Sequence, residues 1–498
     1  MKGERAAGPW LASVALASCL LGGCFGGETP KKGRGSALWI SARSAPVDAP
    51  VLARLESLGL AELFVEAARL EWSGAEPRLE AEALAPAARR LPVTLVVRGA
   101  WPLAEPDAKR TAAALDAGVD RLRLAAEQAG LLPVGVHFDL EVAPAAFEGF
   151  GAALGRLRGE LEGRLFLSAG VDRRALGEPR LATVARGVDF LVCFLYGQRP
   201  GETEDPGAWD LQSVEGNVER LERLGRPYLL GAVTIGELTR RGRDGRVLAV
   251  STDGDLRSLV VQPGLELKPG FSLEGIDRQV YEFVARAGAP AGPWTLAPGE
   301  SVRLVKTATP FLEEFLRRSG AWESPNRLGE LFYRQPAPSE RFSVGAAGLV
   351  AALSPDAARP ELALDLERRL RSDRLWRVRI RLRSTGSEPT DLAYFDANYV
   401  ELRVAGGRIS DVEPGRFRRV ELSIGGAETN TLRAMRNADT VRLFAPLVEP
   451  GESWESGDIE IRLDGDAAPT LTLSSTFLLP EGRLLASEPL EWSFEAAP

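Results

Sequence analysis

Short apolar runs alternate with longer amphipathic stretches from residue 37 to residue 322, and this alternation constrains the fold more than any other feature. The stretches between the apolar runs carry leucine and alanine at helical spacing. Such an order is typical of parallel strands joined by crossover helices. Eight strand-like runs predict an α/β fold, a (β/α)8 TIM-like barrel over residues 37–322. They are ALWISA from 37, LFVEAA from 63, PVTLVVRG from 92, VGVHFDLE from 134, RLFLSAG from 164, VDFLVCFLYG from 188, PYLLGAVTIG from 227 and QVYEFVA from 279.

The alternation is interrupted at about residues 236–278. Asp244-Gly245 and Asp253-Gly254 are typical turn sequences there, so we expect a hairpin-bearing insertion. A calcium loop at the second pair is disfavoured because the other ligands of that pattern are absent. The segment TPFLEEFLRRSG, from Thr309, has an N-cap threonine followed by proline, and we expect it to be the last helix of the barrel.

From residue 340 to residue 498 the pattern changes to short runs in which apolar and polar residues alternate. This period of two is typical of half-buried antiparallel strands, and their spacing predicts an all-β, immunoglobulin-like sandwich. One run, LWRVRIRLR from 375, carries an arginine at every second position from Arg377 to Arg383. We expect these arginines to form a solvated face paired with acidic residues of neighbouring strands. The alternative is a functional basic stripe that binds acidic glycan or lipid phosphate.

The first 23 residues combine a short basic start, an apolar run and small residues, as secretory signal peptides do. Leu21-Gly22-Gly23-Cys24 resembles the bacterial lipobox, whose cysteine is acylated, with palmitate among other acyl chains, and becomes the new N-terminus. The resemblance implies a lipoprotein of the bacterial cell envelope, anchored to the membrane through Cys24. Residues 24–36 would form a flexible tether, and Phe25 in place of aspartate favours the outer membrane. The alternative is an ordinary cleavable signal with a chance cysteine.

The charge and the reactive residue types narrow the chemistry. A formal net charge of −8 without a basic block argues against nucleic acid as a partner. With Cys19 removed and Cys24 acylated, Cys193 would be the single remaining thiol, so no intramolecular disulfide is expected. One histidine in the whole chain makes a zinc site improbable, and no glycine-rich phosphate loop is present. We therefore expect neither a metal nor a cofactor.

The fourth strand-like run, VGVHFDLE, holds the chain's only histidine. Side chains alternate along a strand, so His137, Asp139 and Glu141 are expected to line the barrel interior, with Glu141 nearest the C-terminal rim. Asp139 and Glu141 would stand about 6–7 Å apart along the strand, where each charge affects the proton affinity of the other. A neutral Glu141 beside an ionised Asp139 is the arrangement that acid-catalysed cleavage of a glycoside requires.

The run also resembles the fourth strand of the family-18 glycoside hydrolases, the chitinase-like barrels, which carry D-G-x-D-x-D-x-E. Gly135, Asp139 and Glu141 match this motif, whereas Val134 and His137 stand where the family has aspartates. VDFLVCFLYG is similar to the family's V-D-F-x-x-x-M-x-Y-D and places Tyr196 on its tyrosine, with Gly197 in place of the final aspartate. A lipobox joined to such a barrel is similar to bacterial lipoprotein families whose domains have no known function.

The resemblance implies roles for these residues. Glu141 would protonate the leaving oxygen, Asp139 would orient the acetamido group of the substrate as an internal nucleophile, and Tyr196 would hydrogen-bond the same group. His137 would either hold Asp139 by a hydrogen bond, or be a buried histidine paired with another polar side chain.

Further residues near predicted strand ends are candidates for binding substrate. Arg98 is the strongest because an unpaired arginine at the end of an apolar strand would be costly. Weaker candidates are Glu66, Asp172 and Glu282, for which a surface salt bridge is the alternative, and the aromatic residues Trp39, Trp101 and Trp294, which could stack on sugar rings or pack in the core. Cys193 is expected to be a buried structural thiol.

Two functions remain open from the sequence. One is a membrane-anchored glycoside hydrolase that acts on an N-acetylated glycan, with envelope peptidoglycan as an example. The other is a non-catalytic envelope lipoprotein that binds a glycan or a protein partner through its cleft and its sandwich.

Overall fold

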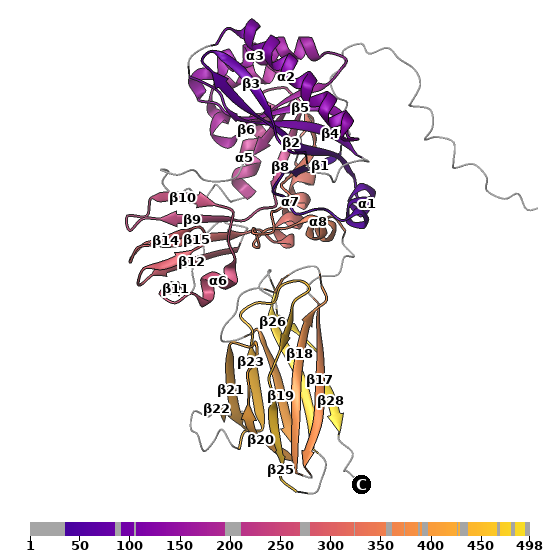
Figure 1. Ribbon diagram of the computed structural model, residues 1–498, viewed down its shortest axis with the longest axis vertical. Helices are drawn as coiled ribbons and strands as arrows, with labels where there is room; N and C mark the ends of the chain where they lie inside the picture. The colour runs from indigo at the N-terminus through magenta and orange to yellow at the C-terminus, as the bar shows by residue number, and fades with distance from the viewer. Residues whose placement is uncertain are drawn as a thin grey trace, which may run out of the picture.

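Figure 1 shows a computed structural model of the chain. It describes residues 35–493 except for gaps at 85–90, 104–105, 195–210, 269–278, 323, 355–360, 373, 387–388, 391–396, 426, 429–436, 466–468 and 480–483. Within these residues the chain forms a barrel, a sheet inserted late in the barrel, and a C-terminal sandwich.

The barrel is a closed ring of parallel strands, which confirms the predicted fold class. The ring closes because the last strand pairs with both the first and the seventh. Its strands, in ring order, are β1 (Ser36–Ile40), β2 (Leu60–Ser73), β4 (Pro92–Ala100), β5 (Leu132–Glu141), β6 (Phe166–Asp172), β7 (Phe190–Phe194), β8 (Tyr228–Val233) and β16 (Arg327–Tyr333).

Helices cover the outside of this ring (Figure 1). They are α1 (Ala49–Ser57), α2 (Ala108–Gln128), α3 (Phe147–Leu161), α4 (Leu181–Gly187), α5 (Leu211–Glu222), α7 (Thr309–Ala321) and α8 (Ala346–Leu353), with short 3-10 turns η1 (Pro144–Ala146) and η2 (Arg173–Gly177). Between β2 and β4 the described residues form a hairpin instead of a helix. Its second strand, β3 (Glu76–Ala81), pairs with the extended end of β2, and Leu79 packs on Gly118 of α2.

The eighth barrel strand was predicted wrongly. QVYEFVA forms β12 (Gln279–Ala285), which pairs antiparallel with β15 (Ser301–Lys306) in a separate sheet. The true eighth strand is β16, whose sequence RLGELFY is interrupted by Gly329 and Glu330 and so has a weaker strand pattern. As a consequence α7 is not the last helix of the barrel, because α8 follows β16.

The insertion is therefore longer than residues 236–278, and its sheet runs from β9 to β15. The strand order is β10-β9-β15-β12-β11, all antiparallel, with α6 (Leu256–Val261) beside them. The expected turn at Asp244-Gly245 is present between β9 (Glu237–Arg241) and β10 (Val247–Ser251). The other elements are β11 (Leu265–Leu267) and a small hairpin of β13 (Ala289–Ala291) and β14 (Trp294–Leu296).

Two antiparallel sheets form the C-terminal sandwich, as predicted. One sheet contains β17 (Leu362–Ser372), β18 (Leu375–Ser384), β25 (Ile459–Leu463), β20 (Gly407–Val412) and β24 (Ser453–Glu455). The other contains β22 (Ala427–Glu428), β21 (Arg419–Ile424), β23 (Thr440–Phe444), β19 (Tyr399–Ala405), β26 (Thr470–Leu478), β27 (Leu484–Ala486) and β28 (Leu490–Ser493).

The arginines of β18 are largely paired with acidic residues, as the alternating pattern predicted. Arg377 contacts Asp458 at 3.1 Å and Glu460 at 2.5 Å, and Arg379 contacts Asp458 at 2.6 Å. Arg381 contacts Glu455 on β24 at 2.6 Å. This part of the row is therefore a charge-paired outer face of the sheet.

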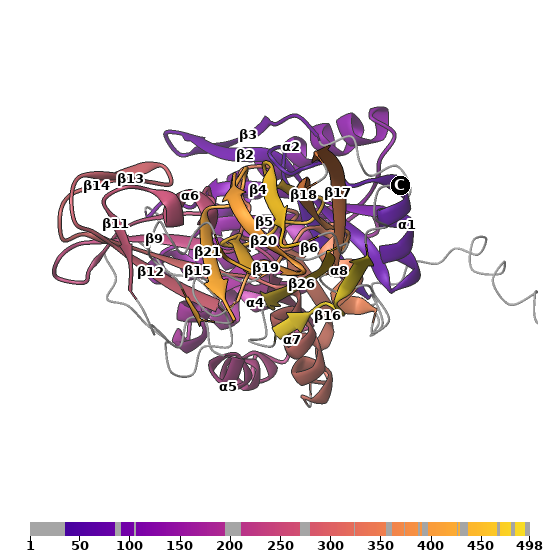
Figure 2. The same ribbon diagram turned by 90° about the horizontal axis from the view of Figure 1, so that it is seen from below.

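The sandwich follows the barrel in the chain, and its side chains also pack against the inserted sheet. Leu447, in the loop before β24, is 1% exposed and belongs to the hydrophobic core of the inserted sheet. Beside it, Arg257 at the start of α6 forms an ion pair with Glu452 at 2.5 Å. Figure 1 shows the sandwich below the barrel and the inserted sheet, and Figure 2, seen from below, shows the inserted sheet to one side of the barrel.

Candidate functional site

A cavity of about 760 Å³ opens at the C-terminal ends of β2, β4, β5, β6 and β7. This is the end of a parallel barrel where loops and strand ends can bring side chains from several strands together. Its charged lining residues are Arg69, Glu71, Arg98, Asp139, Glu141, Asp172 and Arg174, and its apolar lining includes Phe147, Phe150 and Phe194.

Glu141 is the outermost of the three polar residues predicted on the fourth strand. It is the last residue of β5, it is exposed, and it lines the cavity. Its backbone carbonyl accepts a hydrogen bond from the backbone N–H of Trp101 at 2.9 Å, which fixes the end of β5 against the segment that follows β4. The carboxyl group is therefore accessible to a ligand in the cavity, as the sequence predicted.

Asp139 lies two residues deeper on the same face of β5. Its side chain is 26% exposed, and one carboxylate oxygen is 3.6 Å from Nε of Arg98. Burial raises the pKa of Asp139 to about 6, the negative charges of Glu66 and Glu141 act in the same direction, and Arg98 opposes them. The structure thus gives a raised pKa to Asp139, whereas the sequence predicts Asp139 to be the ionised carboxyl group.

Arg98 links two carboxylates on neighbouring strands. It contacts Glu66 at 3.3 Å and Asp139 at 3.6 Å, and its own side chain is 48% exposed to the cavity. Glu66 is buried below it and also accepts a hydrogen bond from Nε1 of Trp39 at 3.1 Å. Arg98 therefore reaches the cavity, whereas Glu66 acts from beneath it.

His137 is completely buried below Asp139. Its Nδ1 atom lies 3.0 Å from the hydroxyl of Ser168 on β6, and the rings of Trp39 and Phe64 pack edge-on against it. Among the described residues its Nε2 atom has no hydrogen-bond partner. Burial lowers its pKa to about 3, so the ring is neutral. His137 is therefore paired with another polar side chain, Ser168, and does not hydrogen-bond Asp139.

Some predicted binding residues lie away from the cavity. Trp39 is 0% exposed inside the barrel, and Trp101 is 5% exposed and packs against Trp72 and Phe150. Neither ring offers a face to a sugar, because both are enclosed by core side chains. Glu282, on β12 of the inserted sheet, is buried and pairs with Arg303 at 3.2 Å. Trp294 belongs to β14 in the same insertion.

Asp172 does line the cavity, but its carboxylate accepts hydrogen bonds from the backbone N–H groups of Arg174 and Ala175. It is thus the cap of η2. Tyr196, Gly197 and Cys24 lie outside the residues that the structure describes. Cys193 is buried, as expected, and burial raises the pKa of its thiol.

Two aromatic residues of the site were missed from the sequence. Phe194, the end of β7, lines the cavity and packs against Tyr333, the end of β16, with ring centroids 4.8 Å apart. The alternation of Phe190 and Val192 would have placed Phe194 on the inner face. Tyr333 could not be placed there because β16 itself was not recognised.

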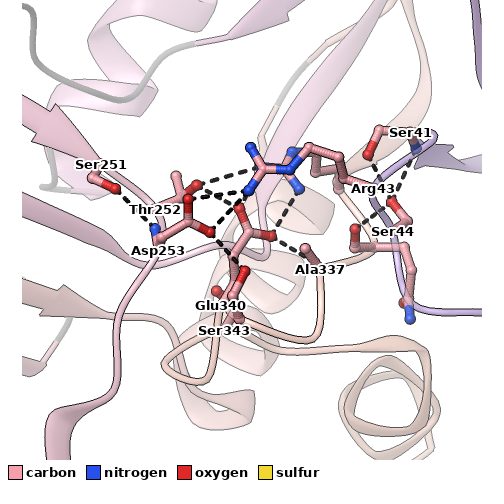
Figure 3. A network of polar contacts seen from close by, with 12 residues as sticks. Ser41, Arg43, Ser44, Ser251, Thr252, Asp253, Ala337, Glu340 and Ser343 are labelled. Carbon is pink, nitrogen blue, oxygen red and sulfur yellow. Dashed lines mark hydrogen bonds and ion pairs between the residues drawn. The ribbon is translucent and has the colours of Figure 1, made fainter. Parts of the chain in front are cut away.

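A polar network fixes the loops that follow β1 and β16 (Figure 3). Arg334, next to Tyr333, forms an ion pair with Glu340 at 2.5 Å, and the two side chains are 12% and 0% exposed. The same carboxylate accepts the backbone N–H of Ala337 at 2.7 Å. Arg43, after β1, pairs with Asp253 of the insertion at 3.0 Å. Glu340 also accepts a hydrogen bond from Thr252, and this contact and the one between Arg43 and Asp253 join the barrel rim to the inserted sheet.

In the described part of the chain, no group of three or more His, Cys, Asp or Glu side chains could hold a metal ion. The same residues contain no helix that is long and apolar enough to cross a membrane.

No family model and no curated protein matches the sequence. Among solved structures, the spore cortex-lytic enzyme SleL of Bacillus megaterium is similar at 12% identity and a TM-score of 0.43, covering 65% of this chain and 75% of that one. A class V chitinase of Pseudomonas fluorescens has 13% identity and a TM-score of 0.42, covering 64% of this chain and 98% of its own. SleL of Bacillus cereus has 13% identity and a TM-score of 0.40, with 65% and 74% covered.

Proposed function

We propose that this protein is a glycoside hydrolase that cleaves N-acetylated glycans by acid catalysis. The observation that carries the proposal is that Asp139 and Glu141 lie on one face of one strand and both line the open cavity. Glu141 is exposed there, and no salt bridge to Arg98 buries it. If Glu141 had a purely structural role, it would be buried in an ion pair with Arg98.

In the proposed reaction Glu141 gives its proton to the glycosidic oxygen as the bond to the anomeric carbon breaks. Asp139, as a carboxylate, accepts a hydrogen bond from the acetamido N–H, so that the acetamido oxygen is oriented to attack the anomeric carbon. Water then opens the cyclic intermediate and returns a proton to Glu141. This route needs no protein nucleophile.

A non-catalytic glycan-binding protein is the second candidate. The observation that favours it is the absence, among the described residues, of a hydrogen bond between His137 and Asp139. The polar support that would hold Asp139 from below is then missing, and the carboxylate is left with a long ion pair to Arg98, at 3.6 Å.

Hydrolysis of N-acetylglucosamine oligomers and of peptidoglycan separates the two candidates. The chain from residue 25 retains every described element and can be assayed beside Glu141→Gln and Glu148→Gln. Glu148, in the first turn of α3, lies outside the cavity and serves as a control of equal charge change. We expect Glu141→Gln to lose at least about a hundredfold in kcat, as removal of a general acid does, and the control to keep its activity. Glycan binding without turnover in the unchanged chain would establish the second candidate.

We further propose that the protein is an envelope lipoprotein held in the outer membrane through Cys24. Incorporation of labelled palmitate, and its loss in Cys24→Ser, tests this point independently of enzymatic activity. Label retained in that variant, or a protein released without acyl chains, would contradict it.

A further inference from the structure

The hairpin of β2 and β3 has two faces of opposite character. Its apolar face is turned towards the barrel core and consists of Leu70, Trp72, Pro77 and Leu79. There Leu79 lies against Gly118 of α2, which seats the hairpin on the barrel. The alternate residues are exposed and form what we call the polar face of the hairpin: Arg69, Glu71, Ser73, Glu76, Arg78 and Glu80.

The polar face of the hairpin continues the wall of the cavity. Arg69 and Glu71 both line the cavity. Across the sheet Arg69 stands opposite Arg98, and Arg98 stands opposite Asp139. Residues that stand opposite each other on neighbouring strands share a face of the sheet. The polar face of the hairpin and the carboxylate of Asp139 are therefore turned to the same space.

A floor of small residues lies between Glu71 and the proposed general acid. Glu141 pairs with Ala100 on β4. Glu71 follows the residue that pairs with Gly99, so it lies at the same level on the other side of β4. Neighbouring strands are about 4.8 Å apart, which separates β2 from β5 by about 10 Å. Gly99 and Ala100 both line the cavity, and neither side chain is longer than a methyl group, so a sugar ring can lie over them.

The charged groups of the polar face are not consumed by one another. Glu71 stands opposite Arg78, and Arg69 stands opposite Glu80, but in the described structure neither pair forms an ion pair. The side chain of Arg69 pairs with Glu82 at 3.7 Å, and the two side chains are 62% and 35% exposed. The side chains of Glu71, Arg78 and Glu80 form no hydrogen bond or ion pair with a described residue. Their donors and acceptors are therefore available to a ligand.

The mixed charge of this face narrows the kind of ligand. Two arginines and three glutamates alternate on it, with Glu82 beside Arg69 and Arg110 of α2 beside Glu76 at 3.5 Å. Neither sign of charge dominates, so the face does not select an ion. It offers hydrogen-bond donors and acceptors side by side, and a neutral polyhydroxylated chain uses both.

We propose that the polar face of the hairpin binds sugar units of the glycan remote from the bond that is cleaved, so that the protein acts on long chains in preference to short oligomers. This inference rests on the proposed function, because it extends the same glycan from the carboxylates of β5 across β4 to β2. The strand from Arg69 to Ser73 adds about 13 Å of wall, which is longer than one sugar ring. Binding energy gained from such remote units is available to lower the barrier to cleavage.

The test measures binding of N-acetylglucosamine oligomers of two to six units by calorimetry. Every protein is the chain from residue 25 with Glu141→Gln, so that no oligomer is consumed. The hairpin variant adds Arg69→Ala and Glu71→Ala. The control adds Arg121→Ala and Glu148→Ala, which remove the same charges from exposed positions on α2 and α3, outside the cavity.

We expect affinity to rise with oligomer length and this rise to disappear in the hairpin variant. The six-unit oligomer should bind that variant ten- to a hundredfold more weakly, because hydrogen bonds to two charged groups are lost. The control should keep the dependence on length, and thermal unfolding of both variants checks that the barrel is folded. A hairpin variant that keeps the dependence, an equal loss in the control, or the absence of binding to any oligomer would overturn the inference.

Kinetics separates this inference from the proposed function. Length-dependent binding without cleavage by the chain that retains Glu141 would remove the hydrolase and leave the hairpin as a glycan-binding surface. Cleavage with an affinity that is the same for every length would keep the hydrolase and remove the role of the hairpin.

Discussion

Three alternate residues of β5 differ in depth, and depth sets what each can do. His137 is sealed in the barrel and paired with Ser168, Asp139 is partly covered beside Arg98, and Glu141 is open to solvent. A buried neutral ring, a carboxyl group with a raised pKa and an accessible carboxyl group thus follow one another within five residues. From His137 to Glu141 the side chains become less desolvated and more accessible to a ligand in the cavity.

The pKa of Asp139, about 6, gives a prediction for the pH dependence of hydrolysis. If Asp139 acts as a carboxylate, kcat/KM should fall as the pH drops below about 6, because the carboxylate is then protonated. Arg98→Gln removes a positive charge that favours the carboxylate, so this limb should move up by about one pH unit. Glu66→Gln removes a negative charge and should move it down. The pH profiles of the three proteins check this, and shifts in the same direction would contradict it.

His137 gives a prediction for stability. Its pKa is near 3 in the fold, whereas an exposed histidine has a pKa near 6.5. The unfolded chain therefore binds a proton that the folded chain does not, and stability should decrease as the pH falls from about 6.5 towards 3. The loss is about 1.4 kcal/mol per pH unit. His137→Asn should lack this component, so the free energies of unfolding in urea should differ in slope below pH 6.5 and run parallel above pH 7.

At this scale the sequence placed the carboxylates correctly, because period-two alternation determines which side chains share a face. Arg98 was found by the cost of an unpaired charge at a strand end. Trp39 and Trp101 were expected at the cavity but lie in the core, because alternation shows which face of a strand a side chain is on but not how deeply it is buried. The partner of His137 could not be predicted, because Ser168 comes from another strand whose register is fixed only by the closed barrel.

Among the elements, the strand-like run at 279–285 shows what a local pattern cannot decide. β12 and the barrel strands have the same apolar character, but β12 pairs antiparallel in the insertion. Whether a strand pairs parallel or antiparallel depends on its neighbours in the sheet, and the residues of the run itself do not show it. β16 was missed for the opposite reason, since its partners β1 and β8 make it a strand despite a glycine and a charge within it.

The ion pair between Arg334 and Glu340 holds the loop after β16, and Glu340 also accepts a hydrogen bond from Thr252 of the insertion, so Glu340→Gln tests this joint. This change leaves Arg334 buried opposite a neutral group, and breaking a buried pair costs about 3–5 kcal/mol. Asp253→Asn is the matched control, because its pair with Arg43 is exposed and should cost less than about 1 kcal/mol. Urea unfolding of both variants gives the free energies of unfolding. Equal losses in the two variants would contradict a buried ion pair between Arg334 and Glu340.

For the whole molecule, the important contact is the one between sandwich and insertion. Leu447 is buried in the core of the inserted sheet, so Leu447→Ala should cost about 2–5 kcal/mol and uncouple the sandwich. Calorimetry should then resolve the sandwich as a separate transition. Leu484→Ala, at a residue that is 54% exposed in the same sandwich, should leave the transition unchanged. A single unaltered transition in Leu447→Ala would show that the two parts are joined elsewhere.

The length of the β17–β18 ladder has a consequence for the reach of the molecule. The ladder is about 33 Å long, and the end that contains Ser384 is held next to the inserted sheet through Glu452 and Leu447. The sandwich therefore acts as a stem, and anything bound at its far end would be held about 3 nm from the inserted sheet.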